Sequence, residues 1–347
     1  MEIGSEFWKR KNYFIKGNET LFQSGRTALE AIIRDAIKNY AVTSAILPSY
    51  CCDSMIEPFV RNNISVRFYE ISFGSDNQLR AVLPEAREHE IILFMTYFGA
   101  SELNELEQSE INKWAVSIED RTHSCFSGVS GYKATYSFES YRKWFALDGL
   151  AVARKNIGRI AEPHIPNYRF SELRNTGFDL KSRFMDGENI KKQDFLDLFS
   201  LAGQALAEDY IDKSPTANAI IDYYEIICNI GEIREIRKRN AEILRQGIED
   251  ITQINVLTDN SHNQDCPLFL GISVNDGYRN QLREYLIKNH IYCPVHWPVT
   301  AYHEGLTRNE QVVYSKTLSL ICDQRYSVED MLRFANCIQE FFKVEVN

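Results

Sequence analysis

Apolar and polar residues alternate in two patterns along the first half of the chain. In one pattern, apolar residues recur at the spacing of an amphipathic helix, as in residues 26–37, 53–62 and 105–113. In the other, short apolar runs stand between these segments, and the run at 91–96 is continuous, which is typical of a parallel strand covered on both faces. The predicted strands of this half are residues 45–48, 64–69, 91–96 and 114–118. This rhythm predicts a doubly wound α/β domain with a mostly parallel sheet.

The pattern changes after residue 134. Two further strands are predicted at 134–140 and 149–153, and charged, helix-forming sequence dominates residues 189–251. A mixed section follows, with strands predicted at 254–257, 268–272 and 291–293 and helices at 280–288 and 327–342. We therefore predict a large domain over residues 1–250, including an N-terminal arm, and a smaller α+β C-terminal domain over residues 251–347.

Composition narrows the class of protein. The formal net charge is −9, so no basic field is offered to nucleic acid. No apolar run approaches the roughly 20 residues that cross a bilayer, and the first residues do not form a signal peptide. The eight cysteines form no Cys-x-x-Cys pair, and several stand in apolar runs, as small buried hydrophobic residues do. We expect a cytoplasmic protein without membrane or nucleic-acid partners.

Lys143 is the first candidate for chemistry, because it stands among Tyr141, Trp144 and Phe145. Partial burial disfavours the ammonium form and lowers the pKa, which makes the free amine a usable nucleophile. Such an amine can hold an aldehyde cofactor as a Schiff base and then carry a proton. The alternative is a surface lysine whose aliphatic stem lies along its aromatic neighbours.

Asp120 follows the predicted strand 114–118, at the edge of the sheet where ligands of α/β proteins bind. A carboxylate there can hold a pyridine nitrogen protonated, and His123 would contact the same ring near its phenolic oxygen. Considered alone, Asp120 is equally typical of a strand-end turn or helix cap, and His123 of a packed histidine.

A candidate phosphate-binding segment lies near the start of the chain, where Ser24 and Gly25 precede the helix predicted from residue 26. The free amides of Arg26 and Thr27 would point at an anion such as a phosphate. Ser140 could add a hydroxyl, with Ser137 as the other candidate. Lys143, the Asp120 segment and this helix start together predict a pyridoxal 5′-phosphate site.

These segments resemble the DegT/DnrJ/EryC1/StrS aminotransferases, which are fold-type I pyridoxal phosphate enzymes. The likeness extends from Phe22 to Arg325 and also includes Leu47–Tyr50, Tyr97–Gly99, Val295–Pro298 and Leu318–Leu320. The resemblance implies that Lys143 is the Schiff-base lysine and Asp120 the partner of the pyridine nitrogen. It also implies a homodimer whose sites are lined by both subunits. The reaction implied is the amination of a keto group on a nucleotide-linked sugar, with glutamate as amine donor.

Two positions depart from the family pattern. Cys52 stands where the family places an aromatic residue over the cofactor face, so the stacking partner is missing or is supplied elsewhere, for example by Tyr50. Asn167 resembles the asparagine that reaches the partner subunit's phosphate, but Ile165 replaces the glycine two residues before it. An ordinary surface loop is the other interpretation of this segment.

His296, Trp297 and Arg325 are candidate substrate contacts on the small domain, with ordinary packing as the alternative. No metal site is predicted, because the seven histidines are scattered. Two functions stay open at this point. One is a pyridoxal phosphate-dependent aminotransferase. The other is a protein of the same fold that has lost transamination and binds a partner, or that catalyses another pyridoxal phosphate reaction.

Overall fold

The computed structural model describes residues 17–99, 108–128, 133–257, 265–275 and 277–345. Eight strands form one large sheet, in the order β1 (Glu19–Phe22), β8 (Ala151–Lys155), β7 (Tyr136–Ser140), β6 (Val116–Asp120), β5 (Glu90–Met95), β2 (Ser44–Pro48), β3 (Ser65–Phe73) and β4 (Leu79–Val82). The pairs from β7 through β6, β5 and β2 to β3 are parallel, and both edges are antiparallel. The α/β class with a mostly parallel sheet is thereby confirmed.

Helices α1 (Gly25–Tyr40) and α2 (Asp53–Arg61) form where amphipathic spacing predicts them. The buried side chains of α1 include Ala28, Leu29, Ile32, Ile33 and Ala36, a spacing that gives the helix one apolar stripe toward the sheet. Ser24 begins the helix, because its hydroxyl accepts a hydrogen bond from Thr27 N at 3.1 Å. The short helix α3 (Gln108–Ile111) lies within the helix predicted at 105–113, the rest of which falls partly outside the described residues.

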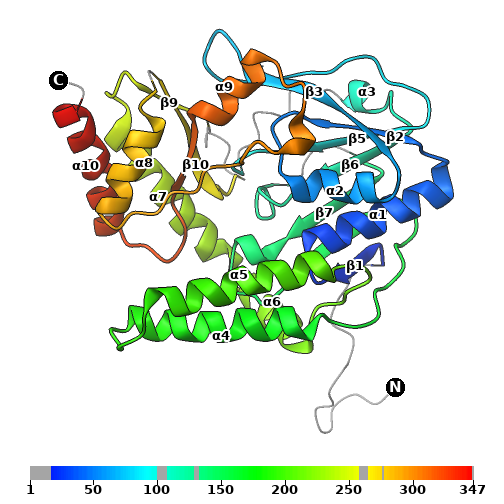
Figure 1. Ribbon diagram of the computed structural model, residues 1–347, viewed down its shortest axis with the longest axis horizontal. Helices are drawn as coiled ribbons and strands as arrows, with labels where there is room; N and C mark the ends of the chain where they lie inside the picture. Colours follow the sequence, from blue (N-terminus) through cyan, green and yellow to red (C-terminus); the bar gives the residue numbers. More distant parts are fainter. Residues whose placement is uncertain (1–16, 100–107, 129–132, 258–264, 276, 346–347) are drawn as a thin grey trace, which may run out of the picture.

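A helical section follows β8 and comprises α4 (Tyr168–Met185), α5 (Lys192–Glu208), α6 (Ala217–Ile227) and α7 (Ile230–Ile248). Helices α4 and α5 form a long hairpin that projects from the body of the molecule (Figure 1). The sequence does not predict α4, since only Phe170, Ser171 and Gly177 are buried along it. Its stability comes from packing against α5, which is a contact between distant residues.

The second sheet is antiparallel, in the order β11 (Thr317–Ile321), β10 (Phe269–Val274) and β9 (Ile254–Val256). Helices α8 (Arg279–Lys288), α9 (Arg308–Lys316) and α10 (Val328–Glu345) accompany it. The strand predicted at 291–293 is wrong, because those residues join no sheet and β11 pairs with β10 instead. Ser327 caps α10 as expected, since its hydroxyl accepts from Asp330 N at 3.2 Å.

The buried apolar residues form separate cores under the two sheets. The core under the small sheet contains Leu270, Leu318 and Ile338, and it also takes Leu244 and Ile248 from α7. Helix α7 therefore packs on the small sheet although it precedes residue 250, where we place the domain boundary. Within the described residues, no helix combines the length and the apolar character that crossing a membrane requires.

Candidate active site

The candidate site lies where β6 and β7 end. The two strands are parallel neighbours, with Asp120 opposite Phe138 in the register, so their carboxyl ends meet at one edge of the sheet. Strand β7 ends at Ser140 and continues into a single 3₁₀ turn, Tyr141–Lys143. The fold thus places the turn that carries Lys143 beside Asp120, at the edge where α/β sheets bind ligands.

The Lys143 side chain is exposed to solvent in this structure, and neighbouring protein atoms remove part of the hydration of its amine. Desolvation lowers the pKa of Lys143, and the neighbouring charge of Arg142 acts in the same direction. The carboxylate of Asp120 acts in the opposite direction, which shows that the amine and the carboxylate are close enough to influence each other. An amine that solvent can reach and that loses its proton readily is suited to attack a carbonyl carbon.

Asp120 is only 5 % exposed, and its Oδ1 accepts a hydrogen bond from Thr122 N at 2.8 Å. Burial raises the pKa of Asp120, while the hydrogen bonds from Thr122 and the charge of Lys143 hold it down. A cationic ring nitrogen placed against this carboxylate would favour the ionised form. Asp120 can therefore bind a protonated heterocycle.

His123 is a buried hydrogen-bond donor. Its Nδ1 accepts from Phe98 N at 3.2 Å, and burial lowers the pKa of His123 well below its usual value, so the ring is neutral. The proton consequently lies on Nε2, which is buried and has no hydrogen-bond partner in the described part of the chain. An unsatisfied buried donor costs about 1–3 kcal/mol. A ligand oxygen that accepts from Nε2 would recover that cost.

The backbone at Phe98 and Gly99, which supplies the amide that donates to His123, is left-handed. Phe98 has a φ of 59° and Gly99 a φ of 88°. A Cβ on Gly99 would lie 2.8 Å from the His123 carbonyl oxygen, so glycine is required for this close approach. The turn directs the Phe98 amide at His123 and so fixes the tautomer of the imidazole.

His296 and Trp297 line the same site from the loop before α9. The Trp297 ring stacks on the His123 ring, with centroids 5.6 Å apart and planes 27° apart. The His296 ring lies 5.5 Å from that of His123, and its Nδ1 is 2.8 Å from Ser319 Oγ. Both side chains therefore lie beside His123.

The start of α1 approaches the end of β7 closely. A Cβ added to Gly25 would lie 3.1 Å from Ser140 Cβ and 3.6 Å from Ser140 Oγ. The first amides of the helix, at Gly25 and Arg26, have no acceptor within the helix. The hydroxyl of Ser140 and these amides form one polar surface of the kind that binds phosphate.

Cys52 also belongs to this group. It precedes α2 as its N-cap residue, and its Sγ lies 2.9 Å from Ser54 Oγ. A negative charge on its thiol would raise the pKa of Lys143, which indicates proximity. Tyr50, the substitute considered for a stacking aromatic, is fully buried and lies against Tyr97 with centroids 5.3 Å apart. Its ring is therefore not available to a ligand in this conformation.

Two predicted residues do not join the group. Asn167 is the N-cap of α4: its Oδ1 accepts from Phe170 N, and its Nδ2 donates to the carbonyls of Ala205 and Asp209, both at 2.9 Å. All polar groups of the Asn167 side chain are thus used within this chain. The guanidinium of Arg325 is held by Asp323, at 2.8 Å and 2.6 Å.

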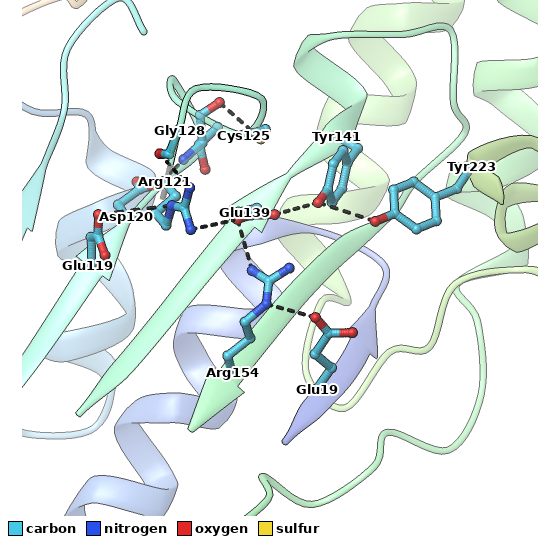
Figure 2. Close-up of polar contacts among 11 residues, drawn as sticks. Glu19, Glu119, Asp120, Arg121, Cys125, Gly128, Glu139, Tyr141, Arg154 and Tyr223 are labelled. Atoms are coloured by element: carbon cyan, nitrogen blue, oxygen red, sulfur yellow. Dashed lines mark hydrogen bonds and ion pairs between the residues drawn. The ribbon is translucent and has the colours of Figure 1, made fainter. Parts of the chain in front are cut away.

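The sequence interpretation missed two features next to Lys143. One is Arg142, whose Nε is buried and has no hydrogen-bond partner in the described residues. A second basic residue beside the candidate lysine was the available signal. The other is the Glu139 cluster, which consists of Glu139, Tyr141, Arg121 and Arg154 (Figure 2).

The comparisons with known proteins were made on sequence and on structure. No protein-family model matches the sequence, and no curated protein matches it either. Solved structures do match. The aminotransferase TlmJ from Streptoalloteichus hindustanus is similar with a TM-score of 0.66 and 11% identity, covering 95% of this chain and 87% of that one.

A DegT DnrJ EryC1 StrS aminotransferase from Brucella abortus matches with a TM-score of 0.62 and 13% identity, covering 93% of this chain and 85% of that one. The GDP-4-keto-6-deoxy-D-mannose-3-dehydratase of E. coli with bound hydrated PLP gives a TM-score of 0.62 and 11% identity, covering 92% and 87%. The chain has the fold of these enzymes.

Proposed function

We propose that the chain is a pyridoxal phosphate-dependent aminotransferase that aminates a keto group, with a nucleotide-linked sugar as acceptor and glutamate as donor. The observation that carries the proposal is the convergence of Lys143, Asp120 and His123 at the ends of β6 and β7. Two properties of these residues fit the cofactor: a lysine amine of lowered pKa and a buried donor without a partner. The likeness in fold to aminotransferases supports the same reaction class.

The residues divide the work of holding the cofactor. Lys143 would bind the aldehyde carbon, Asp120 the ring nitrogen, and His123 Nε2 the phenolic oxygen. The amides of Gly25, Arg26 and Thr27, with the hydroxyl of Ser140, would hold the phosphate, although Thr27 N already donates to Ser24. Pyridoxal phosphate, when bound, supplies an electrophilic carbon and an aromatic ring that takes up the electron pair released at the substrate α-carbon.

Lys143 also moves protons in this proposal. Once a donor amine displaces it, its free amine lies beside Asp120 and His123 and can take a proton from the substrate and return it. The lowered pKa keeps a fraction of the amine unprotonated, which a base requires. His296 and Trp297 would exclude water from the far side of His123, and Cys52 would contact the cofactor ring at the position where the family pattern has an aromatic residue.

The wider assignments belong to the same proposal. We place the domain boundary near residue 250 and the protein in the cytoplasm, and we expect a homodimer. Cysteines that are free and mostly buried support a reducing compartment. The chain offers no internal support for Asn167 as a contact to the partner subunit's phosphate, because its side chain is fully bonded within its own chain.

The test is spectroscopic. The purified protein with added pyridoxal phosphate should show the visible absorbance of cofactor bound to a lysine amine, and glutamate should bleach that absorbance. The variant Lys143→Ala should lose both the absorbance and turnover, with a fall in kcat of several orders of magnitude. A protein that never shows the band would overturn the proposal.

A second function is favoured by one comparison, since the same fold carries the sugar dehydratase of E. coli. A dehydratase that acts on a keto sugar also needs the amine form of the cofactor to condense with the ketone, so an amine donor such as glutamate would bleach its band as well. A chain that has lost catalysis and acts as a binding partner would show no turnover with any donor. The sugar product therefore separates the three functions: an aminotransferase leaves nitrogen on the sugar, a dehydratase leaves a sugar that has lost a hydroxyl group, and a binding partner leaves the sugar unchanged.

A further inference from the structure

Arg142 is a cation without a partner. It lies in the 3₁₀ turn between Ser140 and Lys143, its Nε is buried, and no hydrogen bond or ion pair joins it to the described part of the chain. Desolvation lowers the pKa of Arg142. The side chain as a whole is half-buried, and a buried guanidinium nitrogen without an acceptor is unfavourable, so the fold leaves an unsatisfied donor at this point.

The neighbours of Arg142 do not compensate for this charge. Arg26 lowers its pKa further, and Arg142 in turn lowers the pKa values of Lys143 and Arg174. Within the part of the chain that the structure describes, the groups that interact with Arg142 electrostatically are thus three cations and the thiol of Cys52, and none of them is a carboxylate. A region of this kind is completed by an anion from outside the chain.

Arg237 shows what a satisfied buried arginine looks like in the same molecule. It is 1% exposed, donates to Gln324 and to the carbonyls of Pro267 and Leu268, and its guanidinium lies 4.5 Å from the Trp144 ring centroid. Arg142 has none of these contacts. The difference leaves the Arg142 guanidinium available to a ligand.

The position of Arg142 identifies the anion. Ser140 stands two residues before Arg142 and lies close to Gly25, the first residue of α1. Arg26, the next residue of α1, is a cation that interacts with Arg142. On pyridoxal phosphate the aldehyde and the phosphomethyl group occupy adjacent ring carbons. A residue next to the Schiff-base lysine is therefore close to the phosphate.

We propose that the Arg142 guanidinium binds the phosphate of the cofactor, together with the amides at the start of α1. This inference depends on the proposed function. A phosphate carries a charge of about −1.5 to −2 near pH 7, which one helix N-terminus, equivalent to roughly half a charge, does not neutralise. A guanidinium adds the remaining charge and directional donors. Arg142 thus sets the affinity for the phosphorylated form of the cofactor.

The experiment compares pyridoxal phosphate with pyridoxal, which lacks the phosphate. Apparent Kd values are measured by absorbance for the wild type, Arg142→Gln and Arg142→Lys. Arg142→Gln should raise the Kd for pyridoxal phosphate by about 10- to 100-fold and the Kd for pyridoxal by less than about twofold. The reason is that only a charge-assisted hydrogen bond to phosphate is lost. Arg142→Lys keeps the charge and should lose less.

Arg174→Gln is the matched control, because the Nε of this neighbouring cation also lacks a partner in the described residues, while its guanidinium stacks on Phe178 and donates to the Leu147 carbonyl. It should leave the ratio of the two Kd values within about threefold of wild type, as expected for a charge that does not touch the phosphate. Inorganic phosphate alone should raise the Tm of the cofactor-free wild type and not that of Arg142→Gln.

Several results would overturn the inference. Equal weakening of both ligands would mean that Arg142 positions Lys143 and does not bind phosphate. Unchanged affinities would mean that it binds nothing. A loss confined to the binding of uridine diphosphate would assign Arg142 to substrate phosphates. If the wild type binds neither pyridoxal form, the proposed function itself fails, while the phosphate effect on Tm still reports on Arg142.

Discussion

Two groups of charged side chains meet at the end of β7, and they differ in how their charges are paired. In the Glu139 cluster, Glu139 Oε1 lies 2.8 Å from Arg154 Nη1 and 3.6 Å from Arg121 Nη1, and Tyr141 OH donates to Oε2 (Figure 2). On the other side, Arg142 has no anion, and His123 keeps a buried donor without a partner in the described residues.

The difference separates structural charge from functional charge. Alternate residues of a strand face opposite sides of the sheet, so Glu139 and Ser140 point to different environments although they are consecutive. The Glu139 side is neutralised within the chain. The Ser140 side leads to the turn with Lys143, and it carries net positive charge and hydrogen-bond donors without acceptors. These features lower the stability of the folded chain unless a ligand binds.

Breaking the Glu139 cluster should have the largest effect on stability. Glu139→Gln removes the carboxylate that Arg154 and Arg121 share and leaves them Glu19 at 2.9 Å and Glu119 at 4.0 Å, so the loss is that of charge-assisted contacts, about 1–3 kcal/mol. Urea unfolding followed by circular dichroism measures this loss. Glu208→Gln is the control, because Glu208 pairs with Arg169 where both side chains are 65% exposed, and it should leave the midpoint unchanged. A Glu139→Gln protein as stable as wild type would contradict the comparison.

The positions of the catalytic candidates could be predicted from the sequence because they follow from local pattern. Asp120 ends a strand of apolar residues, and Lys143 follows the next strand in the sheet. Parallel pairing of β6 and β7 then brings the two together without any further information. The same logic holds for Ser24 and Gly25 before an amphipathic helix.

The pairing state of each side chain could not be predicted, since it depends on residues distant in the chain. Asn167 is saturated by carbonyls of Ala205 and Asp209, which belong to the far end of α5. Tyr50 is enclosed by Tyr97 and Trp297, which come from two other segments. Sequence pattern shows which residues reach the site, and long-range contacts decide which of them stay free.

The pH dependence of stability should test the unpaired side of the site through His296. Burial lowers the pKa of His296 to about 3, whereas in the unfolded chain a histidine protonates below about pH 6.5. Between these values the unfolded state binds more protons, so stability falls as the pH falls. Each such histidine contributes a slope of up to about 1.4 kcal/mol per pH unit.

The measurement is the free energy of unfolding at several pH values between about 6 and 4.5. His296→Asn keeps a polar group near Ser319 and removes the titration, so its slope should be shallower than that of wild type. Carboxylates with lowered pKa, such as Asp323, contribute to both proteins equally and cancel in the difference. Identical slopes would show that His296 titrates normally and is not held neutral by the site.

The smallest expected effect on cofactor affinity concerns Asn167, whose side chain is fully hydrogen-bonded within the chain. Asn167→Ala removes the cap of α4 and two bonds to carbonyls of the α5 end, which should lower stability by about 1–2 kcal/mol. The affinity for pyridoxal phosphate should change by less than about twofold, because a saturated amide makes no bond to phosphate.

Thr216→Ala is the matched control for Asn167→Ala, since Thr216 caps α6 in the same way, with its hydroxyl accepting from Ala219 N at 3.1 Å. Both variants should lose stability, and neither should lose cofactor affinity. A loss of affinity of about tenfold or more in Asn167→Ala alone would mean that its bonds within the chain exchange for a phosphate contact when the cofactor and a partner subunit are present. In that event hydrogen-bond saturation in one chain would not be a sufficient criterion for separating structural from functional polar groups at this site.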